Sequence, residues 1–372
     1  MAGQLADSDA GSGIFPRANR RAAYDPYCPS RERHNRCFMQ LDFHYYAVYH
    51  LAELAGLSSS AAETVAYASQ YVDDATESEP VVPFPDQQFD TVRTAHYNLG
   101  AFDWNVQKKI YMPFHFLPAT IRWSDPAAFS YVTRPASLQM NDLAAKLVQN
   151  VLAEPEPAFR QIRMGVALHT IADTFSHFGF SGRQSEENHV GRIWHAKKGG
   201  GWDYKFLKSY ADIFIPEIGH VQSFEYPDLP YLTWRYKNHQ GKYRKRDNTV
   251  HCLKGTRLIY KILSHMSDPN NTSADLKADF PGQYEKIRTL FAKPGNTHAR
   301  NKRWRSYTGA PVYDPLQWRK AALTGDVQWD AMSRPQRMIH INRGKDGFDT
   351  SNWARFHRAA HLQRSRVLAW LN

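Results

Sequence analysis

Residues 158–180 constrain the fold most, because they place two histidines and an aspartate among apolar stretches of one helical pattern. The segment reads AFRQIRMGVALHTIADTFSHFGF, and its apolar residues occupy several helical faces, so we expect it to lie at the centre of the fold. His169, Asp173 and His177 recur every four residues and therefore share one stripe of that helix. Buried imidazoles and carboxylates need partners. The stripe therefore predicts either a metal site or a metal-free pair of hydrogen-bonded His and Asp side chains.

The spacing of the stripe favours more than one metal ion. His169 and His177 lie about 12 Å apart along a helix that rises about 1.5 Å per residue, which is too far for both to bind one ion. Asp173 lies midway between them, and a carboxylate can bridge two ions that are about 3.5–4 Å apart. The pattern therefore predicts a multinuclear site in which Asp173 is shared.

Other segments place histidines or carboxylates in apolar or aromatic surroundings. The candidate ligands among them are His44 in DFHYYAVYH, Asp73 and Asp74 in AYASQYVDDATES, His96 in RTAHYN, His115 in PFHFLP, and His220 in EIGHVQSF. The next segment, YPDLP, adds a nearby carboxylate, Asp228. Two adjacent carboxylates at a helix C-terminus oppose the helix dipole unless a cation or basic group lies nearby, and a solvated acidic turn is the alternative. His50 is interpreted as a core-edge or surface histidine. These ligand types suit zinc, with manganese and iron open as alternatives.

The remaining pattern predicts an all-α fold with long loops. Helices are expected at residues 41–55, 60–75, 141–154, 158–180, 255–266, 283–292 and 350–372. Ser60 and Glu63 match the spacing of a capping box that opens the second helix. Pro113 and Pro118 bracket His115 and argue against a regular helix there.

The domain organisation follows from the same patterns. Residues 1–38 are interpreted as a basic, partly disordered N-terminal extension. Residues 39–372 are expected to form a single helical metal-binding domain, with a basic insert at about 237–254 and a C-terminal helix at about 350–371. Residues 197–204 and 216–234 are interpreted as a loop and an irregular segment.

The chain is basic, with 47 Lys and Arg against 36 Asp and Glu among its 372 residues. Basic clusters at 17–36, 237–247 and 298–305, with Tyr243 and Trp304 interleaved, are suited to a nucleic-acid backbone or an anionic membrane surface. A solvated basic face that serves solubility is the alternative.

Cysteine content and hydropathy indicate the location of the protein. Three cysteines are an odd number, which argues against a disulfide framework. No segment approaches the roughly 18–20 apolar residues that span a bilayer, and the N-terminus lacks the apolar region of a signal peptide. We therefore expect no transmembrane segment, and a location that is cytoplasmic, or exported without a cleavable signal peptide.

The segments DFHYYA, QYVDDAT, PFHFLP and His-x-x-x-Asp-x-x-x-His resemble the zinc-dependent phospholipase C and tri-zinc nuclease superfamily. They also resemble a largely uncharacterised bacterial family that we associate with the same fold. The resemblance covers roughly residues 39–235 and implies a multi-helix metallohydrolase core that holds two or three zinc ions. The metal ligands that it implies are His44, Asp73 or Asp74, His96 or His115, His169, Asp173, His177 and His220. It also implies that Asp173 bridges two ions and that Asp73 or Asp74 accepts a proton in catalysis.

The chain departs from that superfamily at three points. The secreted members ligate zinc through a mature N-terminal Trp, which this chain lacks. Phe224 stands four residues after His220, where those enzymes carry a carboxylate. His177 follows Asp173 by only four residues, which is closer than the superfamily places its next histidine. A two-ion site is therefore as compatible with the sequence as a three-ion site.

The expected function is hydrolysis of a phosphodiester by a metal-activated water. The expected partner is an anionic, phosphate-containing substrate. A phospholipid head group, with peripheral membrane contact, is the first hypothesis, and a single-strand nuclease on the same site is the second. The third is a non-enzymatic protein with a structural metal, in which protein ligands close the coordination sphere.

Overall fold

A computed structural model describes residues 41–77, 80–85, 87–95, 103–122, 129–205, 217–324 and 343–372. The structure is 55% helix and 12% strand, with antiparallel sheets of two and four strands among these residues. The predicted all-α fold is therefore wrong, and the chain is a mixed α/β protein. Residues Arg36–Asn372 form one compact unit. The predicted N-terminal extension at residues 1–38 and the candidate ligand His96 lie outside the described residues.

The elements have the following bounds. The α-helices are α1 (Val48–Leu54), α2 (Ser59–Asp74), α3 (Trp104–Val106), α4 (Leu143–Leu152), α5 (Pro157–Ser176), α7 (Asn248–Ser267), α8 (Leu276–Asp279), α9 (Pro281–Ala292), α10 (Thr297–Thr308), α11 (Gln317–Ala322) and α12 (Asn352–Leu371). The π-helical segments are η1 (Asp42–Ala47) and η3 (Gln107–His115), and the 3₁₀ turns are η5 (Glu186–Asn188), η7 (Val221–Ser223), η8 (Tyr226–Asp228) and η9 (Phe348–Thr350). The strands are β1 (Val81–Phe84), β2 (Gln87–Phe89), β3 (Gly191–Ala196), β4 (Trp202–Tyr204), β5 (Thr233–Lys237) and β6 (Tyr243–Asp247).

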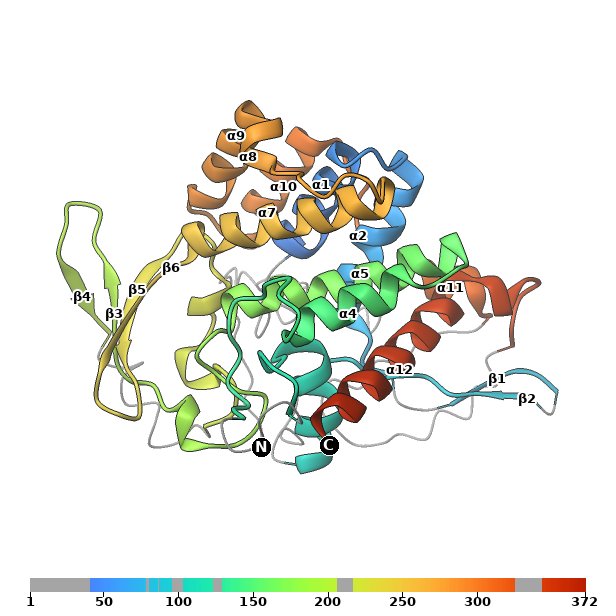
Figure 1. The fold of residues 1–372 in the computed structure, drawn as a ribbon, viewed down its shortest axis with the longest axis horizontal. Coiled ribbons are helices and arrows are strands. Elements are labelled where there is room, and N and C mark those ends of the chain that lie inside the picture. Colours follow the sequence, from blue (N-terminus) through green and yellow to red (C-terminus); the bar gives the residue numbers. More distant parts are fainter. Residues whose placement is uncertain are drawn as a thin grey trace, which may run out of the picture. The chain divides into compact units, whose positions relative to one another are not determined.

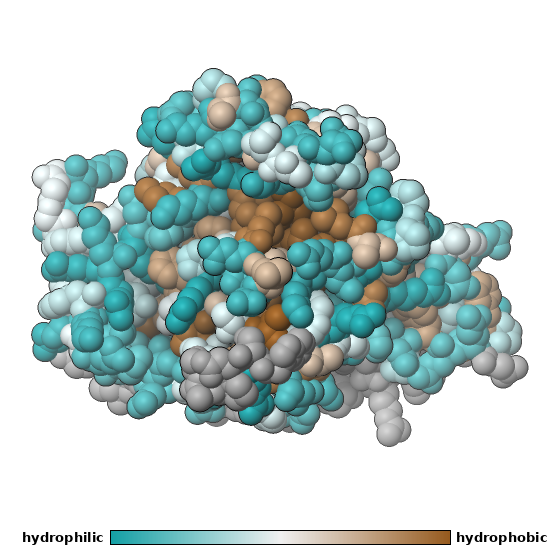
Figure 2. Space-filling view, in the orientation of Figure 1, coloured by the Kyte–Doolittle hydropathy of each residue, from teal (hydrophilic) through white to brown (hydrophobic). Residues whose placement is uncertain are grey.

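Helix α5 is the central helix, as its apolar pattern predicted. Every residue from 162 to 176 is buried, and α2, α4, α7, α12 and η3 all pack against it (Figure 1). Figure 2 shows apolar side chains gathered in the band between α5 and α7, with mostly hydrophilic surface around it. None of the helices in the described ranges is both long and apolar enough to span a bilayer. The polar residues of α5 therefore lie inside a helical core.

Two π-helical segments carry predicted ligands. His44 lies in η1, and His115 ends η3, which contains Pro113. The expected break of helical structure between the two prolines is therefore only partly correct. A π-helix bonds each residue to the fifth one before it, and this wider turn relieves the clash of the proline ring with the preceding turn. Helix α2 also differs in detail, because Ser58 and not Ser60 caps it by accepting the amide of Ala61.

The four-stranded sheet has the order β4–β3–β5–β6 and is antiparallel throughout. Its inner face buries Ile193, Trp234 and Tyr236 in a second, smaller core. The loop predicted at 197–204 therefore ends in β4, and the irregular segment predicted at 216–234 runs into β5. The basic insert at 237–254 consists of the β5–β6 turn, β6 and the start of α7.

Candidate metal centre

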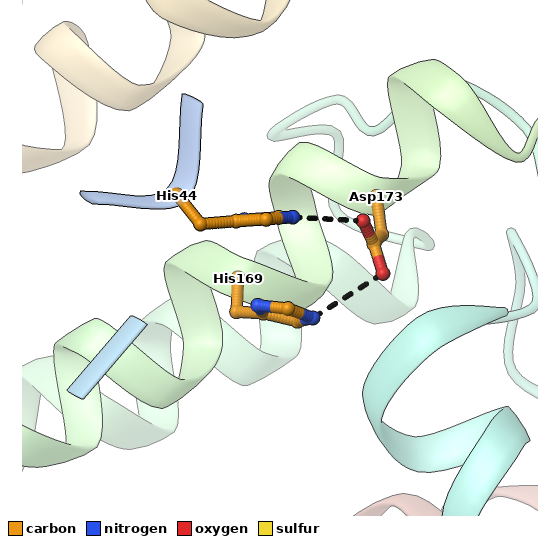
Figure 3. A group of neighbouring side chains, drawn as sticks. All are labelled: His44, His169 and Asp173. Atoms are coloured by element: carbon orange, nitrogen blue, oxygen red, sulfur yellow. Dashed lines mark ion pairs between the residues drawn. The ribbon is translucent and has the colours of Figure 1, made fainter. Parts of the chain in front are cut away.

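Helix α5 and the π-helical segment η1 bring three predicted ligands together (Figure 3). The imidazoles of His44 and His169 both point at the carboxylate of Asp173. His44 Nε2 lies 3.2 Å from Asp173 Oδ1, and His169 Nε2 lies 3.3 Å from Asp173 Oδ2. The two rings stack with centroids 4.0 Å apart. Each oxygen of Asp173 therefore faces a different histidine.

Two more predicted ligands complete what we call the inner group: His44, Asp73, His115, His169 and Asp173. His115 Nδ1 is 3.0 Å from Asp173 Oδ2 and 3.2 Å from His169 Nε2. Asp73 Oδ1 lies 3.6 Å from His169 Nε2 and 4.0 Å from His115 Nδ1. The inner group thus draws on four separate segments, which are η1, α2, η3 and α5.

Beside it lies a second set, which we call the outer group: His177, His220 and Asp228. His177 caps the end of α5, and its Nε2 is 3.3 Å from Asp228 Oδ1. His220 Nε2 is 3.5 Å from the other oxygen of Asp228. The two groups touch where Asp173 Oδ2 lies 3.5 Å from His177 Nδ1, the nitrogen that donates to His115 O. None of the eight residues is more than 5% exposed.

Backbone carbonyls fix the orientation of four of the histidines. The acceptors are Ser69 O for His169 Nδ1 (2.8 Å), Thr94 O for His115 Nε2 (2.8 Å), His115 O for His177 Nδ1 (2.8 Å) and Phe224 O for His220 Nδ1 (3.0 Å). A carbonyl oxygen can only accept, so each of these ring nitrogens carries the proton. Phe224 holds its carbonyl in place with a left-handed backbone, at φ 55°, which is a strained conformation for a residue with a Cβ.

The second nitrogen of each ring therefore presents a lone pair to carboxylate oxygens. Two lone pairs about 3 Å apart repel each other unless a proton or a metal ion lies between them. His44 shows the same need, because neither of its ring nitrogens forms a hydrogen bond with any residue that the structure describes. A histidine that donates one N–H to a carbonyl and points its other nitrogen at carboxylates is the usual arrangement of a metal ligand. The buried His and Asp clusters of this protein could thus hold a metal ion, since three triples of their ligand atoms lie within 4.8 Å of one another.

The electrostatics of the two groups follow from burial. Burial raises the pKa of Asp73 well above its usual range, and the carboxylates of Asp173 and Asp74 add to that rise. Burial also raises the pKa of Asp228 to about 7 and lowers the pKa of His169 to about 3. Burial alone would also raise the pKa of Asp173. The imidazoles of His177 and His169 outweigh burial, and the pKa of Asp173 lies well below its usual range. Crowded buried carboxylates of this kind are stabilised by a cation.

The remaining candidate residues are Asp74, which lies outside both groups, and His96, which lies outside the described residues. Asp74 accepts hydrogen bonds from Tyr313 Oη (2.7 Å) and Gln70 Nε2 (3.4 Å), and none of the ligand triples in the described part of the chain includes it. Of the pair His96 and His115, the structure describes only His115, and it lies in the inner group. Sequence reasoning did not include Asp228 among the ligands, because it does not occupy the carboxylate position four residues after His220. The signal that could have found it is an Asp eight residues after a His in a short, proline-rich turn.

His50 offers a matched control for the inner group, because it lies on the same helical segment as His44 but faces elsewhere. Its Nε2 contacts Gln283 Oε1 at 3.2 Å, and its ring packs on Tyr307. We expect His50→Ala to leave the metal content unchanged, whereas His44→Ala lowers it, as elemental analysis of the two purified variants would measure. Equal loss of metal from both variants would mean that the wrong face of this segment has been assigned.

Comparison with known proteins places the chain in one family. No curated protein and no solved structure matches it. Residues 39–371 match a family described as a family of unknown function, DUF6765. The matched range contains every residue of the inner and outer groups. The chain belongs to this family of unknown function, DUF6765.

Proposed function

We propose that the protein is a metal-dependent phosphodiester hydrolase. The observation that carries this proposal is the presence of two adjacent ligand groups. Asp173 turns one oxygen to His44 and the other to His115 and His169, and His177, whose Nε2 faces Asp228, packs against the same carboxylate. Two adjacent groups of His and carboxylate ligands are suited to a two-metal hydrolytic site. The resemblance of these segments to the zinc-dependent phospholipase C and tri-zinc nuclease superfamily supports the same reading.

The donors favour two zinc ions. Because His169 Nδ1 binds Ser69 O, only Nε2 of this residue remains as a ligand, and it serves one ion. The triples His44–His169–Asp173 and Asp73–His115–His169 share this nitrogen and therefore describe one ion, and the outer group holds a second. A third ion is compatible with Asp73 and His115 only if further ligands join them. Nitrogen and carboxylate donors suit zinc, with manganese and iron as alternatives.

The residues of the two groups have distinct roles in the proposed reaction. Divalent ions bound here supply a water of lowered pKa and polarise the phosphate oxygens of the substrate. Asp73 is the proton acceptor in our proposal, because its carboxylate lies in the inner group, 3.6 Å from His169 Nε2. Asp74 was the other candidate, and we assign it the role of a hydrogen-bond acceptor for Tyr313.

Metal analysis is the first test of this proposal. We expect elemental analysis by mass spectrometry to find two or more zinc, manganese or iron ions on each chain after chelator washing and reconstitution. The loaded protein should hydrolyse a soluble aryl phosphodiester, and a chelator should abolish that hydrolysis until metal is restored. A value near zero that reconstitution leaves unchanged would overturn the proposal.

Substrate assays separate the remaining alternatives. Release of phosphate-containing head group from a soluble lipid analogue identifies a phospholipase, and cleavage of single-stranded DNA identifies a nuclease. Tightly held metal with no turnover of the lipid analogue, the aryl diester or DNA would mean that the metal is structural. This last outcome must be tested because all eight side chains are buried, and a structural metal site is closed by its protein ligands.

A further inference from the structure

The outer face of the four-stranded sheet alternates aromatic and basic side chains. Because strand residues point to opposite faces in turn, burial of Ile193, Trp234 and Tyr236 puts their neighbours on the outer face. By strand register this face carries Trp194, Trp202, Tyr204, Arg235, Lys237, Tyr243 and Lys245, which we call the sheet platform. Ala196, Thr233 and Asp247 lie on the same face at the ends of their strands. Strand pairing aligns Tyr204, Trp194, Arg235 and Lys245 in one row across it.

Aromatic rings, and not carboxylates, surround the cations of the sheet platform. The Arg235 guanidinium lies 4.5 Å from the ring centre of Trp202, 5.0 Å from that of Trp194 and 5.3 Å from that of Tyr243. Lys237 and Lys245 lie within 6.0 Å of the rings of Tyr243 and Trp202. Among the described residues, no carboxylate forms an ion pair with these three cations. Their charge is therefore available to an anionic partner, and Tyr243 remains 55% exposed.

The sheet also carries most of the net charge of the chain. Residues 191–205 and 233–247 contain ten Lys and Arg against two Asp, whereas the whole chain has a net charge of +11. Lys197, Lys198 and Lys242 lie in the two turns of the sheet. The glycines of these turns, 199–201 and 241, have open space on the side where a Cβ would lie. Such a concentration of positive charge attracts polyanions.

We propose that the sheet platform binds single-stranded nucleic acid. Exposed rings interleaved with cations are suited to stacking unpaired bases while the cations hold the phosphates, and a duplex keeps its bases out of reach. An anionic membrane is less favoured, because the turns that would enter it read KKGGG and NHQGK and offer no apolar side chain. The proposal goes beyond hydrolysis, since binding at the sheet platform requires neither metal nor turnover.

The sheet platform is tied to the outer group by a buried arginine on the opposite face of β6. Arg246 Nη2 donates to Ser176 O at 2.9 Å and to Phe178 O at 2.8 Å, which are the residues on either side of His177. Its guanidinium also stacks on Phe178, 3.7 Å from the ring centre. The sheet is therefore anchored next to the candidate metal centre. Single-stranded nucleic acid bound to the sheet platform would be held on an element fixed to that centre.

Fluorescence anisotropy in excess chelator tests the proposal separately from hydrolysis. The probe is a labelled oligothymidylate of about 20 nucleotides, which covers at least one binding site of typical size. We expect the variant that combines Tyr243→Ala with Lys245→Glu to bind at least about tenfold more weakly, because a stacking ring and a phosphate-binding charge are both removed. The slope of log Kd against log salt should fall by about 0.7 for each phosphate that the variant no longer neutralises.

Two matched variants control for the removal of an exposed ring and of a positive charge. Trp104→Ala removes a ring that is 49% exposed on α3, and Lys261→Glu reverses an exposed charge on α7. Both should bind the oligonucleotide like the unchanged protein. Equal weakening in the controls, equal affinity for duplex DNA, or binding to phosphatidylserine vesicles without binding to the oligonucleotide would each overturn the proposal. Because no outcome depends on turnover, failure here leaves the proposed hydrolase untouched, and the reverse also holds.

Discussion

Asp173→Asn should remove the ion of the inner group and lower metal-dependent hydrolysis by at least about a hundredfold, while helical content stays near that of the unchanged protein. The carboxylate of Asp173 faces four imidazoles, one from Oδ1 and three from Oδ2. The substitution keeps the shape of the side chain but removes its charge. It also replaces one acceptor oxygen by an NH₂ group, which cannot ligate a metal. The inner group loses its central ligand, whereas the outer group keeps its three ligands His177, His220 and Asp228.

Metal stoichiometry distinguishes this role from a general loss of structure. Asp228→Asn changes a carboxylate that contacts only His177 and His220 among the eight residues of the two groups. This variant should lose the outer ion and keep the inner one, whereas Asp173→Asn should lose the inner ion and keep the outer one; a general loss of structure would release both. Circular dichroism checks that both variants remain folded. If Asp173→Asn retained full metal content and full hydrolysis, the assignment of the site would be wrong.

The helical core could be predicted from the sequence because each of its signals is local. Apolar residues recur on several faces of residues 158–180, and the structure has α5 at Pro157–Ser176. The last residues of that segment leave the helix, because His177 caps it and Gly179 adopts a positive φ of 83°. The C-terminal helix has the same origin, and α12 at Asn352–Leu371 lies within the predicted range.

The sheet was missed because its strands are short and its polar face is basic. The segments RIWHA, TWRYK and YRKRD alternate as strands do, but each contains charged residues that are typical of a solvated loop. The alternation places Trp234 and Tyr236 inside and Arg235 and Lys237 outside. The four strands form one sheet because β3 pairs with β5, which lies far along the chain beyond β4. Such a long-range pairing leaves no local pattern in the sequence.

The candidate site could be predicted in composition but not in arrangement. His44, Asp73, His115, His169, Asp173, His177 and His220 all lie in the two groups, as the apolar surroundings of each residue favoured. Their division into an inner and an outer group depends on which backbone carbonyl each imidazole meets, and those carbonyls come from distant segments. The same limit explains Asp74, whose neighbour Asp73 lies one residue earlier on α2 and so faces a different direction.

Gly165→Ala should destabilise the protein by about 2–4 kcal/mol, although alanine is the better helix former by about 1 kcal/mol. Gly165 lies where α5 crosses α2. A Cβ at this position would come 2.3 Å from Val65 O, 2.5 Å from Ala68 Cβ and 3.0 Å from Ser69 N. These atoms belong to the backbone or are fixed to it, so no side-chain rotation relieves the clash. The two helices must therefore move apart.

The same displacement should weaken metal binding, because α2 supplies Asp73 of the inner group and the carbonyl that orients His169. Ser69 O accepts the N–H of His169, and Asp73 lies one turn further along the helix. Gly165→Ala should therefore lower both the thermal midpoint, by several degrees, and the metal content measured on the folded protein at low temperature. Gly282→Ala is the matched control, since Gly282 lies in α9 and a Cβ there meets nothing within 4 Å. If both variants melted like the unchanged protein, the close contact of α2 with α5 would be ruled out, and with it the positions that we assign to Asp73 and His169.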